Sequence, residues 1–308
     1  MKPNIDTEIL RAALEKALGE EILHMTLVQE CSRPENFSVL TRSSAHYAVK
    51  CCEVTPNSLS RLEALEAHLR ELESVGARAI RLVRPPLSVQ EKYRVFITNW
   101  CAGGRVMPNK LSAMQRRKLP EALLQFSDQP QHVTHALPAR NLLELRQDVA
   151  EKLGPARFKG IFKCVAPWFG DEFFTYRSNE LKVIHGDLHH GNFYWLEDDL
   201  SGVLDLEEFR YGYTTDDWIR YITCAVEHTL WCDFTARDRI LSVFRTLVPH
   251  FPAHQWHTAI NGALIRKAAM RLAKTRNRLW YCMNMKYRVD FYRRLHKIVE
   301  TLHSSQDR

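Results

Sequence analysis

Residues 183–212 constrain this chain more than any other part of its sequence. They read V-I-H-G-D-L-H-H-G-N-F-Y-W-L-E-D-D-L-S-G-V-L-D-L-E-E-F-R-Y-G, in which short apolar runs end on polar clusters. The first cluster contains Asp187 and, five residues later, Asn192, and the second contains Asp205. Mg²⁺ takes oxygen ligands and usually binds one or two protein groups together with substrate phosphates. Carboxylates at strand ends in this order therefore predict a magnesium site.

Phosphoryl-transfer enzymes present the same order of groups: an Asp near the acceptor hydroxyl, an Asn on a metal ion, and then a metal-binding Asp. The segment H-G-D-L-H-x-G-N and the later strand ending in L-D-L-E-E resemble the aminoglycoside phosphotransferase and choline kinase family. Gly212 and Asp217-Trp218 fit a later pattern of that family. The resemblance implies an α+β, two-lobed protein kinase-like fold with a small β-rich N-terminal lobe and a larger, mostly helical C-terminal lobe.

The resemblance also implies an ATP-dependent transfer of a γ-phosphoryl group to the hydroxyl of a small-molecule acceptor. Asp187 is expected to orient that hydroxyl and take its proton. Asn192 and Asp205 are expected to hold Mg²⁺ against the β- and γ-phosphates. His185 is expected to brace the loop, and Asp217 is expected to be buried and to anchor the loop backbone by hydrogen bonds.

The N-terminal part of the chain contains the candidates for nucleotide binding. Tyr47-Ala48-Val49-Lys50 resembles the V-A-I-K strand of kinases, whose Lys contacts the α- and β-phosphates and is held by a Glu of the next helix. Glu66, sixteen residues after Lys50, is our choice for that partner, and Glu63 is the alternative. The turn at residues 31–36 lies where the phosphates would be covered but has no glycine, so Ser32 and Asn36 are the candidates for phosphate contact.

Apolar periodicity predicts a β-rich first part and a helical second part. A helix is predicted at residues 6–21, strands at 25–30, 37–41, 47–53 and 94–100, and another helix at 60–74. Later helices are predicted at 110–127, 141–153 and 166–179, then one capped by Thr215 or Asp216 that runs to about residue 231, and about three more between 236 and 302. Cys101-Ala102-Gly103-Gly104 resembles an inter-lobe hinge, so we predict a nucleotide-binding lobe at 1–102 and a catalytic and acceptor-binding lobe at 103–308.

The composition is that of a globular protein. The chain has 308 residues, 45% of them hydrophobic, and no run approaches the about 18 apolar residues that a membrane span needs. The N-terminus lacks the apolar core of a signal peptide, and the spacing of the eight cysteines fits neither a zinc ribbon nor a disulfide framework. We therefore expect a cytoplasmic protein with reduced thiols, no transmembrane segment and no nucleic-acid partner.

Positive charge is concentrated near the C-terminus. Residues 266–297 contain eleven Lys or Arg and one acid, Asp290, and Arg271, Lys274 and Arg278 recur at helical spacing. One interpretation is the solvated face of an amphipathic helix, and the other is a surface for an anionic acceptor, a membrane or a polymer. An aminoglycoside or choline-like acceptor would favour acidic side chains, so the basic stretch favours a hydroxyl acceptor that is itself anionic.

Other classes of protein share parts of this pattern. The His and Asp cluster could be a polar turn, or part of a dinuclear metallophosphoesterase, although that class requires a D-x-H turn that is not found before Gly186. A pseudokinase that regulates a partner is a further alternative, which the complete set of Lys50, Asp187, Asn192 and Asp205 disfavours. A protein-serine kinase is another, but the A-P-E and activation-loop signature is absent after Asp205.

Overall fold

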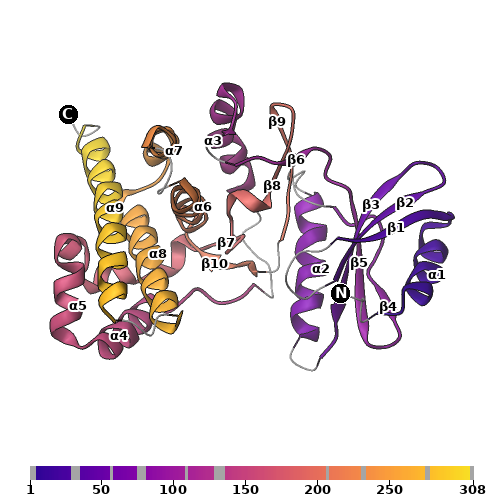
Figure 1. Cartoon of the computed structure of the whole chain (residues 1–308), viewed down its shortest axis with the longest axis horizontal. Coiled ribbons are helices and arrows are strands. Elements are labelled where there is room, and N and C mark those ends of the chain that lie inside the picture. Colours follow the sequence, from indigo (N-terminus) through magenta and orange to yellow (C-terminus); the bar gives the residue numbers. More distant parts are fainter. Residues whose placement is uncertain are drawn as a thin grey trace. The chain divides into compact units, whose positions relative to one another are not determined.

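The computed structural model describes residues 5–28, 35–55, 58–74, 81–107, 110–127, 136–205, 208–229, 234–274 and 278–305 (Figure 1). The chain divides into two compact units. Unit 1 comprises Met1–Gly104, Gln129–Ala136 and Phe193–Glu207. Unit 2 comprises Arg105–Asp128, Leu137–Asn192 and Glu208–Arg308. The chain thus leaves unit 1 at Gly104, and Phe193–Glu207 returns to it. The division into a nucleotide-binding lobe at 1–102 and a catalytic lobe at 103–308 stays a prediction.

Unit 1 is built on a five-stranded antiparallel sheet with the strand order β1-β2-β3-β5-β4. Its strands are β1 (Ile22–Val28), β2 (Glu35–Thr41), β3 (His46–Glu53), β4 (Leu87–Val89) and β5 (Tyr93–Asn99). The strands predicted at 25–30, 37–41, 47–53 and 94–100 overlap β1, β2, β3 and β5 in turn. The periodicity therefore located these strands, with small shifts at their ends.

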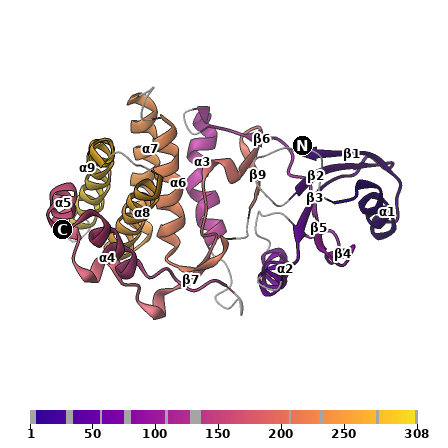
Figure 2. The ribbon, with the colours of Figure 1, turned by 60° about the horizontal axis from the view of Figure 1, so that its bottom comes forward.

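The helices α1 (Thr7–Leu18) and α2 (Leu59–Ser74) lie on opposite sides of this sheet (Figures 1 and 2). Leu10 and Leu14 of α1 are fully buried and form a core with alternate strand residues, among them Val49 and Cys51 of β3. Side chains alternate between the two faces of a strand, so Lys50 points away from this core. The sheet thereby separates the apolar packing of α1 from the face that presents Lys50.

Residues 193–203 add a hairpin to unit 1. β8 (Phe193–Leu196) pairs antiparallel with β9 (Asp199–Val203). The Ser201 hydroxyl donates a hydrogen bond to the carbonyl of Ala102 at 2.5 Å. Gly103 has a φ of +87°, and a Cβ at this position would overlap the backbone carbonyl of Trp195. This close backbone approach requires glycine and explains why the hairpin belongs to unit 1.

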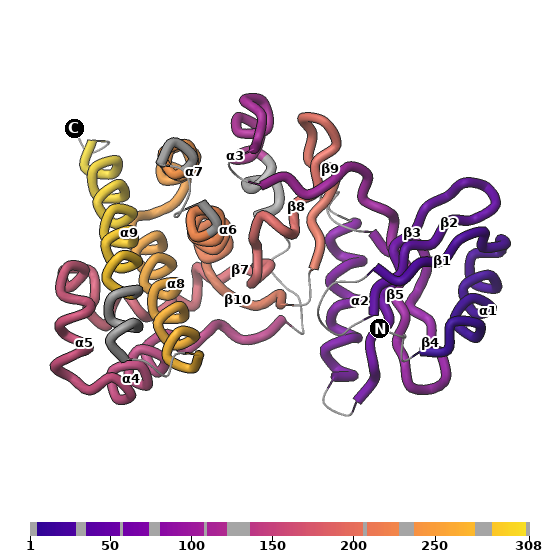
Figure 3. The backbone as a smooth tube through the Cα atoms, in the orientation of Figure 1, coloured from indigo at the N-terminus to yellow at the C-terminus, as the bar shows by residue number. Residues whose placement is uncertain are grey.

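Unit 2 is mostly helical (Figure 3). Its helices are α3 (Ala113–Ser127), α4 (Leu142–Leu153), α5 (Pro155–Phe162), α6 (Thr214–Thr229), α7 (Phe234–Leu247), α8 (Ala253–Lys274) and α9 (Arg278–Ser304), with a strand pair β7 (Lys182–Ile184) and β10 (Arg210–Gly212). α8 packs against α4, α6 and α9, and its Trp256, Ile260 and Leu264 are fully buried. The helices predicted between 236 and 302 are confirmed as α7, α8 and α9.

The helix predicted at 166–179 is wrong. This segment forms three 3₁₀ turns, η2 (Lys163–Trp168), η3 (Asp171–Phe174) and η4 (Ser178–Glu180). Pro167 lacks a backbone N–H and Gly170 has low helix propensity, so a continuous α-helix is unfavourable here. Two aromatic side chains of this segment, Trp168 and Phe174, are nevertheless buried in the core. Trp168 stacks on His296 of α9 with ring centroids 4.6 Å apart, and its Nε1 donates to Glu300 at 2.7 Å.

Within the described parts of the chain, none of the helices combines the length and the apolar character needed to cross a membrane. The cysteines whose side chains are described, Cys51, Cys52, Cys101, Cys164 and Cys224, are free thiols.

Candidate active site

The loop of residues 185–192, which follows β7, is anchored by a buried side chain of α6. The Asp217 carboxylate, 4% exposed, accepts the backbone N–H groups of His185 at 2.7 Å and of Gly186 at 2.8 Å. The predicted structural role of Asp217 is therefore confirmed.

Gly186 and His185 determine the path of the chain before Asp187. Gly186 has a φ of +81°, and a Cβ at this position would overlap the backbone carbonyl of Glu208. His185 is fully buried, and its Nδ1 accepts the backbone N–H of Asp187 at 3.3 Å. His185 thus braces the loop as the resemblance implied, and only glycine fits at position 186 without strain.

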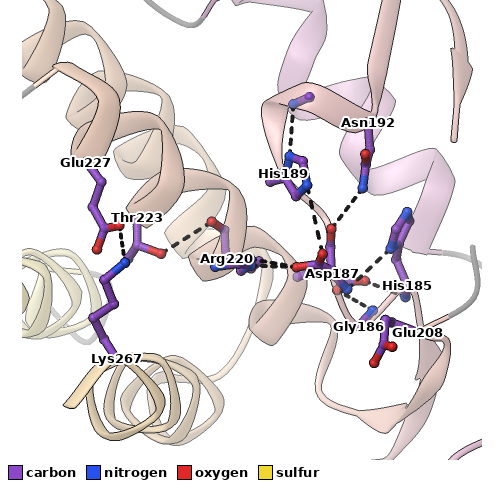
Figure 4. A network of polar contacts seen from close by, with 12 residues as sticks. His185, Gly186, Asp187, His189, Asn192, Glu208, Arg220, Thr223, Glu227 and Lys267 are labelled. Atoms are coloured by element: carbon purple, nitrogen blue, oxygen red, sulfur yellow. Dashed lines mark hydrogen bonds and ion pairs between the residues drawn. The ribbon is translucent and has the colours of Figure 1, made fainter. Parts of the chain in front are cut away.

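Arg220 of α6 holds the Asp187 carboxylate in one orientation (Figure 4). Its Nε lies 2.8 Å and its Nη2 lies 2.7 Å from Oδ1 of Asp187. The other oxygen, Oδ2, lies 3.9 Å from Nε2 of His189, and the Asp187 side chain is 31% exposed. No group within the described residues donates a hydrogen bond to Oδ2. The arginine therefore occupies one carboxylate oxygen and leaves the second accessible to a substrate.

The sequence interpretation did not include Arg220. The signal was present, because Arg220 lies three residues after Asp217, and residues three apart are neighbours on one face of a helix. If Asp217 faces the loop, Arg220 faces it too. One helix face thus supplies both the anchor of the loop backbone and the partner of the Asp187 side chain.

Asn192 ends the loop in the short turn η5 (His190–Asn192). Its side chain is 4% exposed, and its Nδ2 donates a hydrogen bond to the backbone carbonyl of Asp187 at 3.1 Å. An amide side chain carries a donor and an acceptor, so this contact leaves Oδ1 of Asn192 as the atom that can bind a cation. Asp187 and Asn192 therefore lie together, as predicted, in unit 2.

Lys50 and Asp205 form a second group, in unit 1. The Nζ of Lys50 lies 3.4 Å from Oδ1 of Asp205, and the two side chains are 23% and 48% exposed. Asp205 has a φ of +64°, a conformation that is uncommon for residues other than glycine and that occurs at functional sites. Asn36 of β2 is paired directly with Lys50 of β3, so the two side chains are cross-strand neighbours. Ser32 lies outside the described residues.

Glu66 does not hold Lys50, contrary to our expectation. Its two carboxylate oxygens lie 2.7 Å from Arg70 of the same helix and 2.7 Å from Arg94 of β5. The alternative, Glu63, is exposed and forms no ion pair with any described residue. The strand cation that Glu66 meets is Arg94 of β5, and not Lys50 of β3. The pair fastens α2 to β5 instead of positioning Lys50.

Replacing Glu66 with Gln should therefore weaken the fold rather than nucleotide binding. The carboxylate is 16% exposed and Arg94 is 29% exposed, so the free energy of unfolding should fall by about 1–2 kcal/mol. Urea denaturation measures this loss, and the nucleotide Kd should change by no more than about two-fold. Glu63→Gln, an exposed acid of the same helix, is the matched control. A ten-fold weaker nucleotide affinity, on the order of 1.4 kcal/mol, would restore Glu66 as the partner of Lys50.

The residues predicted to bind Mg²⁺ supply the oxygen atoms that this ion requires. Asp205 presents a half-exposed carboxylate in unit 1, and Asn192 presents an amide oxygen in unit 2. In the described ranges, no three His, Cys, Asp or Glu side chains gather into a cation site. Mg²⁺ usually binds one or two protein groups and completes its shell with water and phosphates, so each of these oxygen groups is by itself of the kind that binds a magnesium–nucleotide complex.

Burial raises the pKa of the Asp217 carboxyl to about 7, and the hydrogen bonds from Gly186 and His185 oppose that rise. The usual value for Asp is 3.8, so between about pH 4 and pH 7 the folded protein binds this proton more tightly than the unfolded chain does. The resulting contribution to the free energy of unfolding is fully present below about pH 4. It is lost as the pH rises to 7, at no more than about 1.4 kcal/mol per pH unit.

Asp217→Asn should remove this pH dependence. The amide keeps one oxygen acceptor, so one of the two backbone N–H groups loses its partner, at a cost of about 1–3 kcal/mol. The advantage of the wild type over the variant should therefore be largest near pH 4 and shrink toward pH 7. Denaturation curves of both proteins across this range measure it. A difference that stays constant with pH would show that Asp217 does not titrate in this window.

Solved phosphotransferase structures share this architecture. Amicoumacin kinase hAmiN, in complex with AMP-PNP, Ca²⁺ and Ami, matches with a TM-score of 0.62 at 12% identity over 96% of each chain. Spectinomycin phosphotransferase APH(9)-Ia, in complex with ADP and spectinomycin, matches with 0.60 at 14% identity, over 98% of this chain and 99% of its own. Macrolide 2'-phosphotransferase MphH from Brachybacterium faecium matches with a TM-score of 0.57 at 13% identity, over 92% of this chain and 95% of its own. The predicted kinase-like α+β fold is confirmed.

The match of the sequence to a family model identifies the family, whereas the structural matches show the fold alone. Residues 27–238, well over half of the chain, match the model of the phosphotransferase enzyme family. The chain therefore belongs to this family. No curated protein matches the chain. The matched range contains Lys50, Asp187, Asn192, Asp205 and Asp217, so the resemblance inferred from the central motif is confirmed.

Proposed function

We propose that this protein transfers the γ-phosphoryl group of ATP, bound with Mg²⁺, to a hydroxyl group of a small molecule. The observation that carries the proposal is how the Asp187 carboxylate is held. Arg220 holds one of its oxygens, Asp217 anchors its loop, and Oδ2 stays accessible. A carboxylate with one fixed and one open oxygen is suited to orient an acceptor hydroxyl and accept its proton. Family membership supports the same class of reaction.

In the proposed reaction, the acceptor oxygen forms a bond to the γ-phosphorus while the bond from that phosphorus to the β–γ bridging oxygen breaks. The hydroxyl proton moves to Oδ2 of Asp187, and the nucleoside diphosphate leaves. Lys50, with Asn36 beside it, would contact the nucleotide phosphates. Little covalent chemistry is left to the protein, so positioning and charge stabilisation supply most of the rate increase.

Asn192 and Asp205 would hold Mg²⁺ through Oδ1 of the amide and through the carboxylate. When bound, the ion would neutralise charge on the β- and γ-phosphates. Asn192 also holds the backbone carbonyl of Asp187, and Asp205 also contacts Lys50. Each proposed metal ligand is thus connected to a second residue of the reaction. A change at either position should therefore affect more than metal affinity alone.

A nucleotide-consumption screen tests this function. Purified protein is incubated with Mg²⁺ and ATP or GTP against hydroxyl metabolites, sugars, amino alcohols and the antibiotic classes named for the similar structures. A generic protein substrate is included to test the protein-serine kinase alternative. Transfer to a small molecule by the wild type, lost in Asp187→Asn, is the expected result. Tight nucleotide binding without consumption across the whole panel would favour a pseudokinase.

A further inference from the structure

A cavity of about 150 Å³ in unit 2 has Asp187 in its wall. The loop after β7, together with α6 and α8, forms much of its lining. Its basic side chains are Arg140, Arg210, Arg220, Arg266 and Lys267, and its acidic ones are Asp187, Asp216, Asp217 and Glu227. The charge that a ligand would meet depends on which of these groups already neutralise one another.

Most of the basic side chains of this cavity have an acidic partner. Three close ion pairs account for them. Figure 4 shows the pairs of Arg220 with Asp187 and of Lys267 with Glu227, and the third joins Arg210 to Glu208. Arg140 and Arg266 are different, because neither makes an ion pair or a hydrogen bond with any residue in the described ranges. Both are half-buried. Two guanidinium groups therefore line the cavity without a hydrogen-bond acceptor among the described residues.

These two arginines also repel each other. Burial, and then the charges of Arg266 and Arg210, lower the pKa of Arg140 to about 10, while Asp216 acts in the opposite direction. Asp216 is the nearest opposing charge, since burial raises its pKa while Arg266 and Arg140 both act to lower it, and its Oδ2 accepts the hydroxyl of Tyr176 at 2.9 Å and a backbone N–H at 3.1 Å. One carboxylate therefore faces several guanidinium groups. An anion entering the cavity would relieve this repulsion and satisfy the free donors.

We propose that Arg140 and Arg266 bind an oxyanion, a phosphate or a carboxylate, that belongs to the acceptor. The inference rests on the proposed function, because it assigns the substrate class of that same site. A planar guanidinium donates two parallel hydrogen bonds to phosphate or carboxylate, which an ammonium cannot do. Since Asp187 lines the same cavity, one acceptor molecule can place its oxyanion on the arginines and its hydroxyl at Oδ2 of Asp187. A phosphorylated or acidic hydroxyl compound has this chemistry.

The basic stretch at residues 266–297 contributes only part of this site. Arg266 lines the cavity, whereas Arg271 and Lys274 are not among its described lining residues, and Lys274 is exposed. The side chain of Arg278 lies outside the part of the chain that the structure describes. The anion site therefore combines one residue of the basic stretch with Arg140, which comes from the segment before α4.

Kinetics with matched acceptors test the proposal. The wild type, Arg140→Gln, Arg266→Gln and the double variant are assayed at saturating Mg²⁺–ATP with glucose, glucose 6-phosphate and glucuronic acid, and with equivalent triplets built on any acceptor found. The KM for the anionic acceptors should rise by about 10–100-fold in each single variant, while kcat changes little. The phosphate and carboxylate arms show which oxyanion is preferred. Lys274→Gln, an exposed cation of α8, should behave like the wild type.

Binding of inorganic phosphate supplies a readout that does not need turnover. Calorimetric titration at saturating ADP should show a phosphate site in the wild type and in Lys274→Gln that weakens about 10-fold or more in the double variant. Circular dichroism and melting curves verify that the double variant is folded, and Arg140→Lys with Arg266→Lys should weaken the site less. If the double variant loses the phosphate site but the wild type phosphorylates no acceptor, the result would support the oxyanion site and count against the kinase assignment. Transfer with an unchanged KM in the double variant, or equal weakening by Lys274→Gln, would overturn the oxyanion site and leave the kinase assignment standing.

Discussion

Replacing Asp187 with Asn should lower phosphoryl transfer by about 10²–10⁴-fold. The amide cannot take the proton of the acceptor hydroxyl, and it carries no negative charge for Arg220, which contacts Oδ1 of the wild-type side chain at 2.7 Å. The backbone of the loop should stay in place, because Asp217 and His185 hold it through its N–H groups. The loss should therefore appear in kcat, with nucleotide affinity close to that of the wild type.

Steady-state kinetics with the acceptor found in the screen, together with a nucleotide titration, measure both effects. Asp148→Asn is the matched control, because Asp148 is an acid of α4 that pairs with Lys152 on the helix surface. It should retain wild-type turnover. A turnover of Asp187→Asn within a few-fold of the wild type would exclude Asp187 as the group that accepts the proton.

Replacing Asp205 with Ala should abolish the increase in nucleotide affinity that Mg²⁺ produces and lower turnover by at least ~10²-fold. Metal stabilisation of phosphoryl charge is worth several kcal/mol, and about 1.4 kcal/mol corresponds to a factor of ten. The change also removes the carboxylate that lies 3.4 Å from Lys50. Lys50 should then still attract the phosphates, so some metal-independent nucleotide binding should remain.

Titration of labelled ATP with and without Mg²⁺ separates these contributions. Asp199→Ala changes an acid of β9 in the same hairpin and should keep the full response to Mg²⁺. If Asp205→Ala shows the same metal enhancement as the wild type, another carboxylate holds the ion. Glu208, whose side chain is 44% exposed and pairs with Arg210, would be the next candidate to replace.

The sequence by itself determined the local parts of this protein. Four strands of unit 1, β1, β2, β3 and β5, and the three C-terminal helices follow from the spacing of apolar residues, because burial on one face imposes a period of two or 3.6. The order of Asp187, Asn192, Asp205 and Asp217 identified the family, since the loop after β7 needs each group at a set distance along the chain. His185 and Asp217 could be given structural roles for the same reason, and their hydrogen bonds agree.

Only the tertiary structure decided which charged side chains lie next to one another. Spacing along the chain suggested Lys50 as the partner of Glu66, but the folded structure places Arg94 of β5 beside it. Along residues 163–180, Pro167 and Gly170 prevent a helix that the aromatic spacing suggested, and packing against α9 holds the turns instead. Arg140 and Arg266 are far apart in sequence, and only the packing of α8 brings both to the cavity that Asp187 lines. A periodic pattern specifies which face of an element is buried, whereas the partner across that face depends on long-range packing that no local pattern encodes.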